Sequence, residues 1–225
     1  MATYLVTGSS RGIGLEFVRQ LTARGDTVLA AARQSSAVPP GRGVTPLRLD
    51  VTNAGDLAEL ARTVAGRPID VLINNAGVSG VAKKLADLTS EELERVWRIN
   101  SIAPLMVTRA LLPNLRAGGQ KKVINISSKM GSLTNAANTM DATSYSYRSS
   151  KSVLNMLTVC LANELRGEGL TCVSVHPGWV KTDMGGKEAP LSPQDSVAAM
   201  VKTIDALRPE RTGEFIERDG RTIEW

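Results

Sequence analysis

Two residues in the second half of the chain have the types and the spacing for acid–base chemistry. Tyr147 and Lys151 lie four residues apart in a stretch with helical spacing, so their side chains share one face of the helix. An ammonium group beside a phenol favours the phenolate and lowers the pKa of the tyrosine. A unit charge ~4 Å away, at an effective dielectric constant of ~20, contributes about 4 kcal/mol to that shift. The pair therefore predicts a tyrosine that exchanges a proton with a substrate oxygen.

A glycine-rich turn near the start of the chain has a different chemistry. Residues 3–7 form a short apolar run, then comes the turn Gly8-Ser9-Ser10-Arg11-Gly12-Ile13-Gly14, and a helix is expected over 12–24. Glycines let the backbone approach a pyrophosphate closely, and the free N–H groups of a helix N-terminus attract its charge. Strand, turn and helix in this order predict a dinucleotide site. Its candidate contacts in the turn are Gly8, Ser10, Arg11, Gly12, Ile13 and Gly14.

The residues after the second and third predicted strands indicate which dinucleotide binds. A carboxylate after the second strand would accept the adenosine ribose hydroxyls of NAD. This chain has Ala32 there, followed by Arg33, and a guanidinium suits a 2′-phosphate. Arg11 in the glycine turn adds a second cation. The sequence therefore favours NADP(H) over NAD(H), with Asp50 at the adenine edge and Val51 beside it.

Six motifs in a fixed order resemble those of the short-chain dehydrogenase/reductase family, over nearly the whole chain. They are Thr7-Gly8-x-x-x-Gly12-x-Gly14, Asn74-Asn75-Ala76-Gly77, Asn100, Asn125-Ile126-Ser127-Ser128, Tyr147-x-x-x-Lys151 and His176-Pro177-Gly178. Within the family, the runs at 144–151 and 176–186 and the terminal Trp225 are most similar to one branch. That branch holds the sniffer-type carbonyl reductases and the myxobacterial C-factor.

The resemblance implies a role for each motif residue. Tyr147 would donate the proton when a carbonyl is reduced, and Lys151 would lower the pKa of Tyr147 and bind the nicotinamide ribose. Ser128 would hydrogen-bond the substrate carbonyl. Asn100 would hold a water linked to Lys151, or bond a kinked backbone, and the two roles are compatible. The remaining implied cofactor contacts are Asn75, Ala76, Gly77, Pro177, Gly178, Val180 and Thr182.

The spacing of the serine departs from the family pattern. The family serine usually precedes the tyrosine by about 13 residues, a position that Thr134 occupies here, whereas Ser128 precedes Tyr147 by 19. A strand end fixes a position while a loop tolerates insertion, which favours Ser128. Residues 133–143 are then expected to form an inserted loop at the pocket mouth, with small polar residues that favour mobility. Ser127 is expected to cap the backbone, His176 to be structural, and Tyr145 to pack or line the pocket.

Alternating strand and helix signals predict an α/β fold. Uniformly apolar strands suit a parallel sheet covered on both faces, so we expect one Rossmann-type domain, a doubly wound parallel sheet of about seven strands with helices on both faces. Strands are expected at 3–7, 27–32, 44–49, 69–74, 121–127, 170–175 and 213–217, and helices at 12–24, 53–65, 90–116, 147–166 and 193–206. Pro104 predicts a kink near Asn100.

Composition narrows the possible partners and the compartment. The 225 residues carry a net charge of +5, but the basic residues are scattered and aromatics are few, which argues against nucleic-acid binding. No apolar run reaches the ~20 residues of a membrane span, and the first strand leaves no room for a leader, so a cytoplasmic protein is expected. Cys160 and Cys172 are expected to be buried hydrophobes without a disulfide. One histidine and two distant cysteines predict no metal site.

The leading functional prediction is an NADPH-dependent reductase of a small carbonyl substrate, a ketone, aldehyde or quinone. The alternative is a nucleotide-binding signalling protein of the C-factor type with little turnover. Only five residues separate Gly186 from Ser192, too few for a long substrate-covering segment, so an open and unselective pocket is expected. A homodimer or homotetramer is possible.

Overall fold

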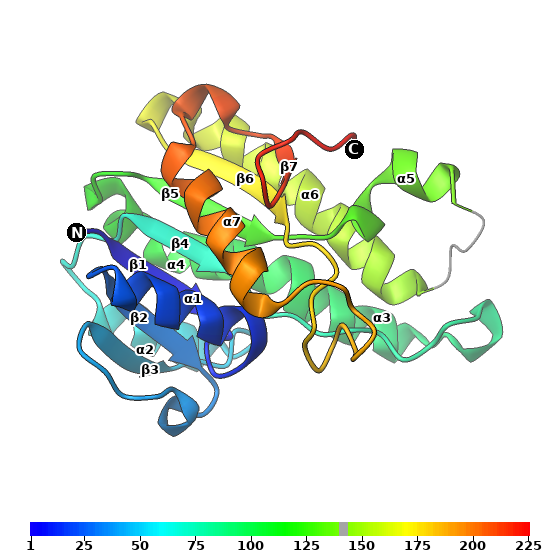
Figure 1. Ribbon diagram of the computed structural model, residues 1–225, viewed down its shortest axis with the longest axis horizontal. Helices are drawn as coiled ribbons and strands as arrows, with labels where there is room; N and C mark the ends of the chain where they lie inside the picture. Colours follow the sequence, from blue (N-terminus) through cyan, green and yellow to red (C-terminus); the bar gives the residue numbers. More distant parts are fainter. Residues whose placement is uncertain (140–143) are drawn as a thin grey trace.

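A seven-stranded parallel sheet forms the centre of the molecule (Figure 1). The computed structural model describes residues 1–139 and 144–225. The strands lie in the order β3-β2-β1-β4-β5-β6-β7, and every neighbouring pair is parallel. Their bounds are β1 (Thr3–Thr7), β2 (Thr27–Ala32), β3 (Val44–Arg48), β4 (Val71–Asn74), β5 (Lys122–Ile126), β6 (Thr171–His176) and β7 (Phe215–Glu217). The predicted doubly wound sheet is confirmed.

Helices cover both faces of the sheet and bury it on both sides. On one face, α1 (Gly12–Ala23) and α7 (Pro193–Ala206) pack against one half of the core, which includes Phe17 and Met200. On the other face lie α2 (Ala54–Thr63), α4 (Ala103–Ala117) and α6 (Tyr145–Leu165), with a second half of the core. Strand residues such as Leu29 alternate with their neighbours between the two halves and are fully buried. Burial on both faces explains why the strands read as continuous apolar runs.

The long helix expected over 90–116 is interrupted where the kink was predicted. It consists of α3 (Ser90–Trp97), a π-helical turn at Arg98–Ile102, and α4. Pro104 lacks the N–H that would bond to the carbonyl of Asn100, so the regular ladder fails at that point. The wider turn places Asn100 in the interior, fully buried, beside the start of α6.

The inserted segment after Ser128 differs from the expected loop. A short 3₁₀ turn (Lys129–Gly131) is followed by the helix α5 (Leu133–Ala137), so its first half is helical and not an open loop. Ser132 caps this helix by accepting from the N–H of Asn135 at 3.0 Å. The backbone N–H and the hydroxyl of Thr134 both donate to the carbonyl oxygen of Trp225, at 2.9 and 2.8 Å. Residues 140–143 of the predicted loop lie outside the described part.

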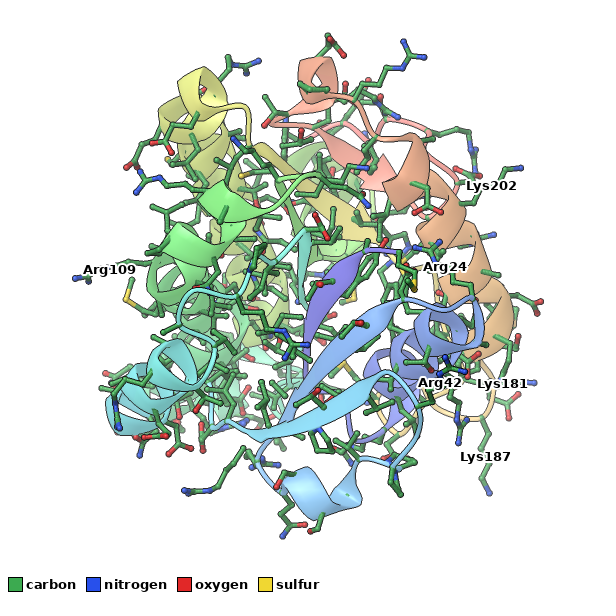
Figure 2. The ribbon with its side chains drawn as sticks, turned by 90° about the vertical axis from the view of Figure 1, so that its left-hand side faces the viewer. Arg24, Arg42, Arg109, Lys181, Lys187 and Lys202 are labelled. Atoms are coloured by element: carbon green, nitrogen blue, oxygen red, sulfur yellow. The ribbon has the colours of Figure 1, made fainter. Side chains whose placement is uncertain are left out.

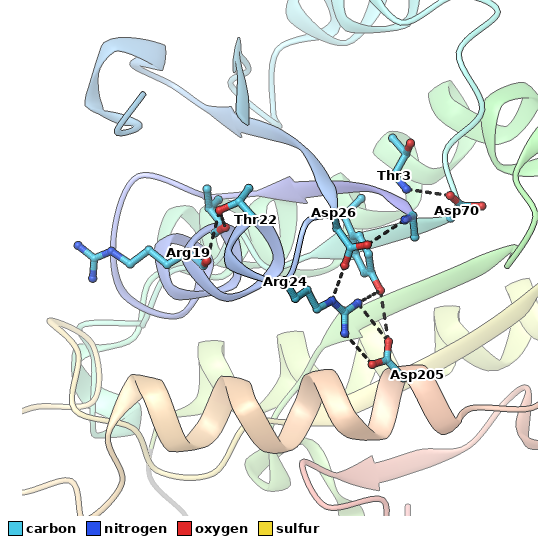
Figure 3. A network of polar contacts seen from close by, with 10 residues as sticks. Thr3, Arg19, Thr22, Arg24, Asp26, Asp70 and Asp205 are labelled. Atoms are coloured by element: carbon cyan, nitrogen blue, oxygen red, sulfur yellow. Dashed lines mark hydrogen bonds and ion pairs between the residues drawn. The ribbon is translucent and has the colours of Figure 1, made fainter. Parts of the chain in front are cut away.

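Polar groups at the amino ends of the strands are bonded to one another (Figure 3). The guanidinium of Arg24 contacts Asp26, donates to the hydroxyl of Tyr4 at 2.6 Å, and donates to Asp205 at 2.6 Å. The carboxylate of Asp70 accepts from the N–H of Thr3 at 2.8 Å. These contacts connect α1, α7 and the starts of β1, β2 and β4 at the end of the sheet away from the glycine turn.

The surface charge is distributed over several elements. Figure 2 shows Arg109, on α4, projecting from one side of the molecule, and Arg42, Lys181 and Lys187 projecting from loops on the other side. Lys202, on α7, also faces outward. None of the helices in the described part of the chain is long and apolar enough to span a bilayer.

Candidate active site

A cleft of about 1390 Å³ runs along the carboxyl ends of the strands, where the order reverses between β1 and β4. In open parallel sheets this is the place where ligands bind. Most of the residues predicted for the site line it: Gly8, Ser10, Arg11, Gly12, Ile13, Arg33, Asp50, Val51, Asn75, Ala76, Gly77, Ser128, Tyr147, Lys151, Pro177, Gly178, Val180 and Thr182. Gly14 and Asn100 are not among the lining residues and lie behind them.

The glycine turn has the geometry of a pyrophosphate cradle. Gly8 has a positive φ of 67°, and a Cβ there would lie 2.9 Å from the Cα of Ala76, so a side chain is excluded. A Cβ on Gly14 would collide with the carbonyl oxygen of Gly8. Among the described residues no side chain caps α1, which leaves its first N–H groups open toward the cleft. The turn therefore fits the phosphates of a dinucleotide.

The part of the cleft beside the ends of β2 and β3 has arginine side chains and one hydrogen-bonded carboxylate. Arg33 and Ala32 line it, as predicted. Asp50 accepts from the N–H and the hydroxyl of Thr52 at 2.9 and 2.7 Å, and these bonds lower the pKa of its carboxyl. Arg11 also lines the cleft, and its guanidinium bonds to Asp183 at 2.8 Å, so its contact with a cofactor stays a prediction. The pair is exposed and joins the glycine turn to the segment after β6.

The catalytic candidates meet at the end of β5. Ser128 follows this strand, and its hydroxyl is hydrogen-bonded to the hydroxyl of Tyr147. The ammonium of Lys151 lies 5.7 Å from the centre of the Tyr147 ring and donates to the carbonyl of Ile126 at 2.8 Å. Both Tyr147 and Lys151 come from the first two turns of α6, so one rigid helix presents them together.

The expected lowering of the Tyr147 pKa is wrong for the chain by itself. Burial raises the pKa of Tyr147, and its bond to Ser128 offsets only part of that rise. Burial also lowers the pKa of Lys151 to about 8, because the ammonium has left water for a site where none of the described residues supplies a carboxylate partner. Desolvation, which an argument from residue spacing alone does not include, is the largest cause of the shift at both groups. Without a further charge, Tyr147 is therefore held in its protonated form.

Asn100 acts as a connector between backbones. Its amide oxygen accepts from the N–H of Val78 at 2.9 Å, and its amide nitrogen donates to the carbonyl of Val78 at 2.9 Å and the hydroxyl of Ser150 at 3.0 Å. The prediction that it bonds a kinked backbone is wrong in its partner, because the backbone that it bonds belongs to the loop after β4 and not to its own kinked helix. Asn100 thereby fixes that loop beside Lys151.

The structure separates the two candidates for the catalytic hydroxyl. The hydroxyl of Thr134 is engaged with Trp225 and does not line the cleft, whereas Ser128 does. Ser127 donates to the amide oxygen of Asn155 on α6 at 2.7 Å, so it holds β5 to that helix and does not cap the backbone.

Several lining residues were not predicted from the sequence. Lys129, Met130 and Trp179 line the cleft, and the indole N–H of Trp179 donates to the carbonyl of Gly185 at 2.7 Å. Lys129 is ion-paired with Glu217, which is buried. Each of these residues is adjacent in the sequence to a motif at the end of a strand. A residue next to such a motif lies at the same edge of the sheet, so this adjacency could have indicated that they line the cleft.

The remaining predicted residues have mixed outcomes. Burial lowers the pKa of His176 to about 4, so it is neutral at pH 7, and its Nδ1 has no partner within the described residues. Tyr145 is exposed and does not line the cleft. Cys172 is buried as predicted, but Cys160 is exposed on the outer side of α6, which corrects that prediction. No group of three metal-binding side chains occurs in the described part of the chain.

Comparison with known sequences points to one family. A family profile described as short chain dehydrogenase matches residues 2–191. The chain is 47% identical to the C-signal protein of Myxococcus xanthus over 165 residues, which is 73% of this chain and 98% of the relative. It is 33% identical over 233 residues to 1-hydroxy-2-glutathionyl-2-methyl-3-butene dehydrogenase of Rhodococcus sp. (strain AD45), and the match covers 100% of both.

Comparison with solved structures agrees. The carbonyl reductase Sniffer of D. melanogaster superposes with a TM-score of 0.93 at 31% identity, and the match covers 100% of both chains. An NADPH-bound carbonyl reductase from chicken fatty liver gives a TM-score of 0.90 at 33% identity, covering 100% of this chain and 99% of the other. The sequence matches and the structural matches therefore agree on the family and the fold.

Proposed function

The chain belongs to the short-chain dehydrogenase family and is an NAD(P)-dependent oxidoreductase, and from this premise we propose that it uses NADPH to reduce a carbonyl to an alcohol. One observation carries the proposal. The hydroxyls of Ser128 and Tyr147 are hydrogen-bonded to each other, with Lys151 behind the tyrosine ring, in the cleft that begins at the glycine turn.

The residues of the cleft fit the cofactor from end to end. The glycine turn and the open N-terminus of α1 would hold the pyrophosphate, and Arg33 would contact the 2′-phosphate. Lys151 would bind the nicotinamide ribose, and the segment from Gly178 to Thr182 would face the carboxamide. When bound, NADPH supplies the hydride.

The chain's own hydroxyls handle the proton and the developing charge. The hydroxyl of Ser128 can donate to the substrate oxygen as negative charge grows on it. Tyr147 can then give that oxygen its proton. Because burial raises the pKa of Tyr147, the phenol stays protonated at neutral pH, the form that reduction requires. The same shift opposes the reverse reaction, in which the tyrosine must first lose its proton.

The lining of the cleft where we place the substrate suits flat, apolar carbonyl compounds. Trp179 and Met184 line this part of the cleft and are 57% and 48% exposed, so they offer an apolar wall that protein does not cover. An uncovered pocket discriminates weakly between ligands. We therefore expect modest turnover of several unrelated carbonyls, with aromatic diketones among the better ones. A preference of about 10⁴ or more for one substrate over its close analogues would contradict this expectation.

NADPH oxidation against a panel of carbonyls tests the proposal. The unmodified protein should turn over several of them, and Tyr147→Phe should lower the rate by about 100-fold or more while NADPH still binds. The similarity to C-signal supports a competing function, a nucleotide-binding signalling protein with little turnover. Binding of NADPH without turnover of any carbonyl by either protein would favour that function. A cytoplasmic location and a homodimer or homotetramer stay predictions.

A further inference from the structure

The helix that carries Tyr147 begins in an unusual way. Ser144, the residue before α6, has a φ of 71° and a left-handed backbone, which is unfavourable for a serine. Within the described residues no side chain caps this helix, whereas Asn53, Thr89 and Ser192 cap α2, α3 and α7. Something other than a local cap must therefore hold the first turn of α6, the turn that contains Tyr147.

A carboxylate on the neighbouring helix α3 contacts the first turn of α6. Glu92, in the first turn of α3, accepts from the hydroxyl of Ser146 at 2.6 Å. Its two oxygens also accept from the N–H of Ala82 at 3.2 and 3.0 Å. Ser146 is fully buried and directly precedes Tyr147. A negative charge beside the first turn of a helix also interacts favourably with the helix dipole.

The third partner in this contact is a glycine. Gly80 lines the cleft, in the loop after β4 that begins with the Asn75-Ala76-Gly77 motif. A Cβ on Gly80 would collide with the hydroxyl of Ser146 and lie 2.7 Å from Glu92 Oε1. The loop backbone therefore approaches the carboxylate more closely than any other residue type would allow.

We propose that Glu92 is a positioning residue, whose carboxylate sets the first turn of α6 against the cleft-lining loop at 76–82. It does not touch the reacting atoms. It acts through Ser146 on one side and Ala82 on the other, so that Tyr147 and the wall of the cofactor cleft keep one relative position. Two further contacts hold the first turns of α6 against the preceding helical segments. Trp97, on α3, donates to Ser149 at 2.8 Å, and Asn100 donates to Ser150 at 3.0 Å.

Three substitutions on α3 separate positioning from general stability. Glu92→Ala should lower kcat by about 10-fold with a smaller change in KM, because a displaced tyrosine affects the chemical step most. Glu92→Gln should restore kcat to within about 3-fold, since one amide oxygen can accept from both Ser146 and Ala82, as Oε1 does here. Glu94→Ala, at an exposed position on the same helix, is the matched control and should leave kcat unchanged.

The kinetic measurement rests on the proposed carbonyl reduction, so a second one is independent of turnover. Amide hydrogen exchange in peptides covering residues 144–152 should be faster in Glu92→Ala and in Ser146→Ala than in Glu94→Ala. If the unmodified protein reduces no carbonyl, the proposed function has failed, and exchange alone decides the role of Glu92. Exchange in both variants equal to that of the control would overturn the inference, as would a kcat for Glu92→Ala equal to that of Glu94→Ala.

Discussion

Two buried lysines lie at opposite ends of β5 and have opposite surroundings. Lys122 begins the strand and donates to the carbonyls of Ile204 and Asp205, at 2.7 and 3.4 Å, at the C-terminal end of α7. The carboxylate of Asp205 partly offsets the lowering of the Lys122 pKa by burial. Lys151 donates to the carbonyl of Ile126, the last residue of the strand, and within the described part of the chain burial alone shifts its pKa.

The difference extends to the two edges of the sheet. At the amino ends, ionised groups such as Arg24, Asp26 and Asp70 bond to one another or to backbone, which stabilises the fold. At the carboxyl ends, no described residue provides a counter-ion for Lys151, and burial keeps Tyr147 in its protonated state. A buried ammonium without a carboxylate costs stability, and such costs concentrate at functional sites. A buried lysine therefore stabilises the fold at one edge, and at the other edge the proposed function gives it a role in catalysis.

The largest expected effect is at the carboxyl edge. Ser128→Ala should lower kcat by about 10²–10³, as loss of one donor to a developing oxyanion usually does. Thr134→Val should change kcat little, because its hydroxyl bonds to Trp225 outside the cleft. Steady-state rates of NADPH oxidation measure both variants. If Thr134→Val had the larger effect, the spacing and not the strand end would locate the catalytic hydroxyl.

At the amino edge, a comparable change should affect stability alone. Arg24→Met removes the cation that contacts Asp26, Tyr4 and Asp205, and leaves the buried Asp26 without its cationic partner, while the N–H of Ala2 still donates to it. We expect the free energy of unfolding to fall by about 2–3 kcal/mol, with kcat at 25 °C unchanged within error. Urea denaturation measures the first and NADPH oxidation the second. A large loss of kcat at unchanged stability would show that the two edges are not separate.

The same substitution at the two lysines should change the free energy of unfolding in opposite directions. Lys151→Met removes a poorly solvated charge and should raise the free energy of unfolding at pH 7 by about 2 kcal/mol. Lys122→Met removes a hydrogen bond to the end of α7 and should lower the free energy of unfolding by about 1 kcal/mol.

The pH dependence of unfolding tests the same contrast in the unmodified protein. The pKa of Lys151 is about 8 in the folded state and higher in the unfolded state, so the unfolded chain binds more protons between the two values. The cost of burying Lys151 is therefore complete below pH 8 and is relieved as the pH rises above it. Lys151→Met should lack this increase in stability. An increase that persists in Lys151→Met would assign it to another group.

The smallest effect concerns the choice of cofactor. Replacing Ala32 by Asp and Arg33 by Ala should shift the ratio of NADPH to NADH affinity by about 10-fold toward NADH, through loss of one charged contact and gain of another. Fluorescence titration of both nucleotides measures it. Tighter binding of NADH than of NADPH by the unmodified protein would show that the end of β2 does not select the 2′-phosphate.

The sequence predicted what depends on local pattern. The strands, the glycine turn and the kink near Asn100 follow from apolar runs, glycine spacing and one proline. The pKa shift of Tyr147 and the exposure of Cys160 could not be predicted this way, because both depend on which tertiary neighbours remove water. The helix at Leu133–Ala137 was missed because its contact to Trp225 joins residues 91 apart in the chain.

The exposed thiol of Cys160 is a position where a fluorescent dye can be attached. The chain has two cysteines, and burial raises the pKa of Cys172 to about 12, which keeps that sulfur protonated and unreactive. A maleimide dye should therefore attach at one position, on the same helix as Tyr147 and Lys151. Changes in its emission would report movements of that helix when a nucleotide binds, without any engineered cysteine.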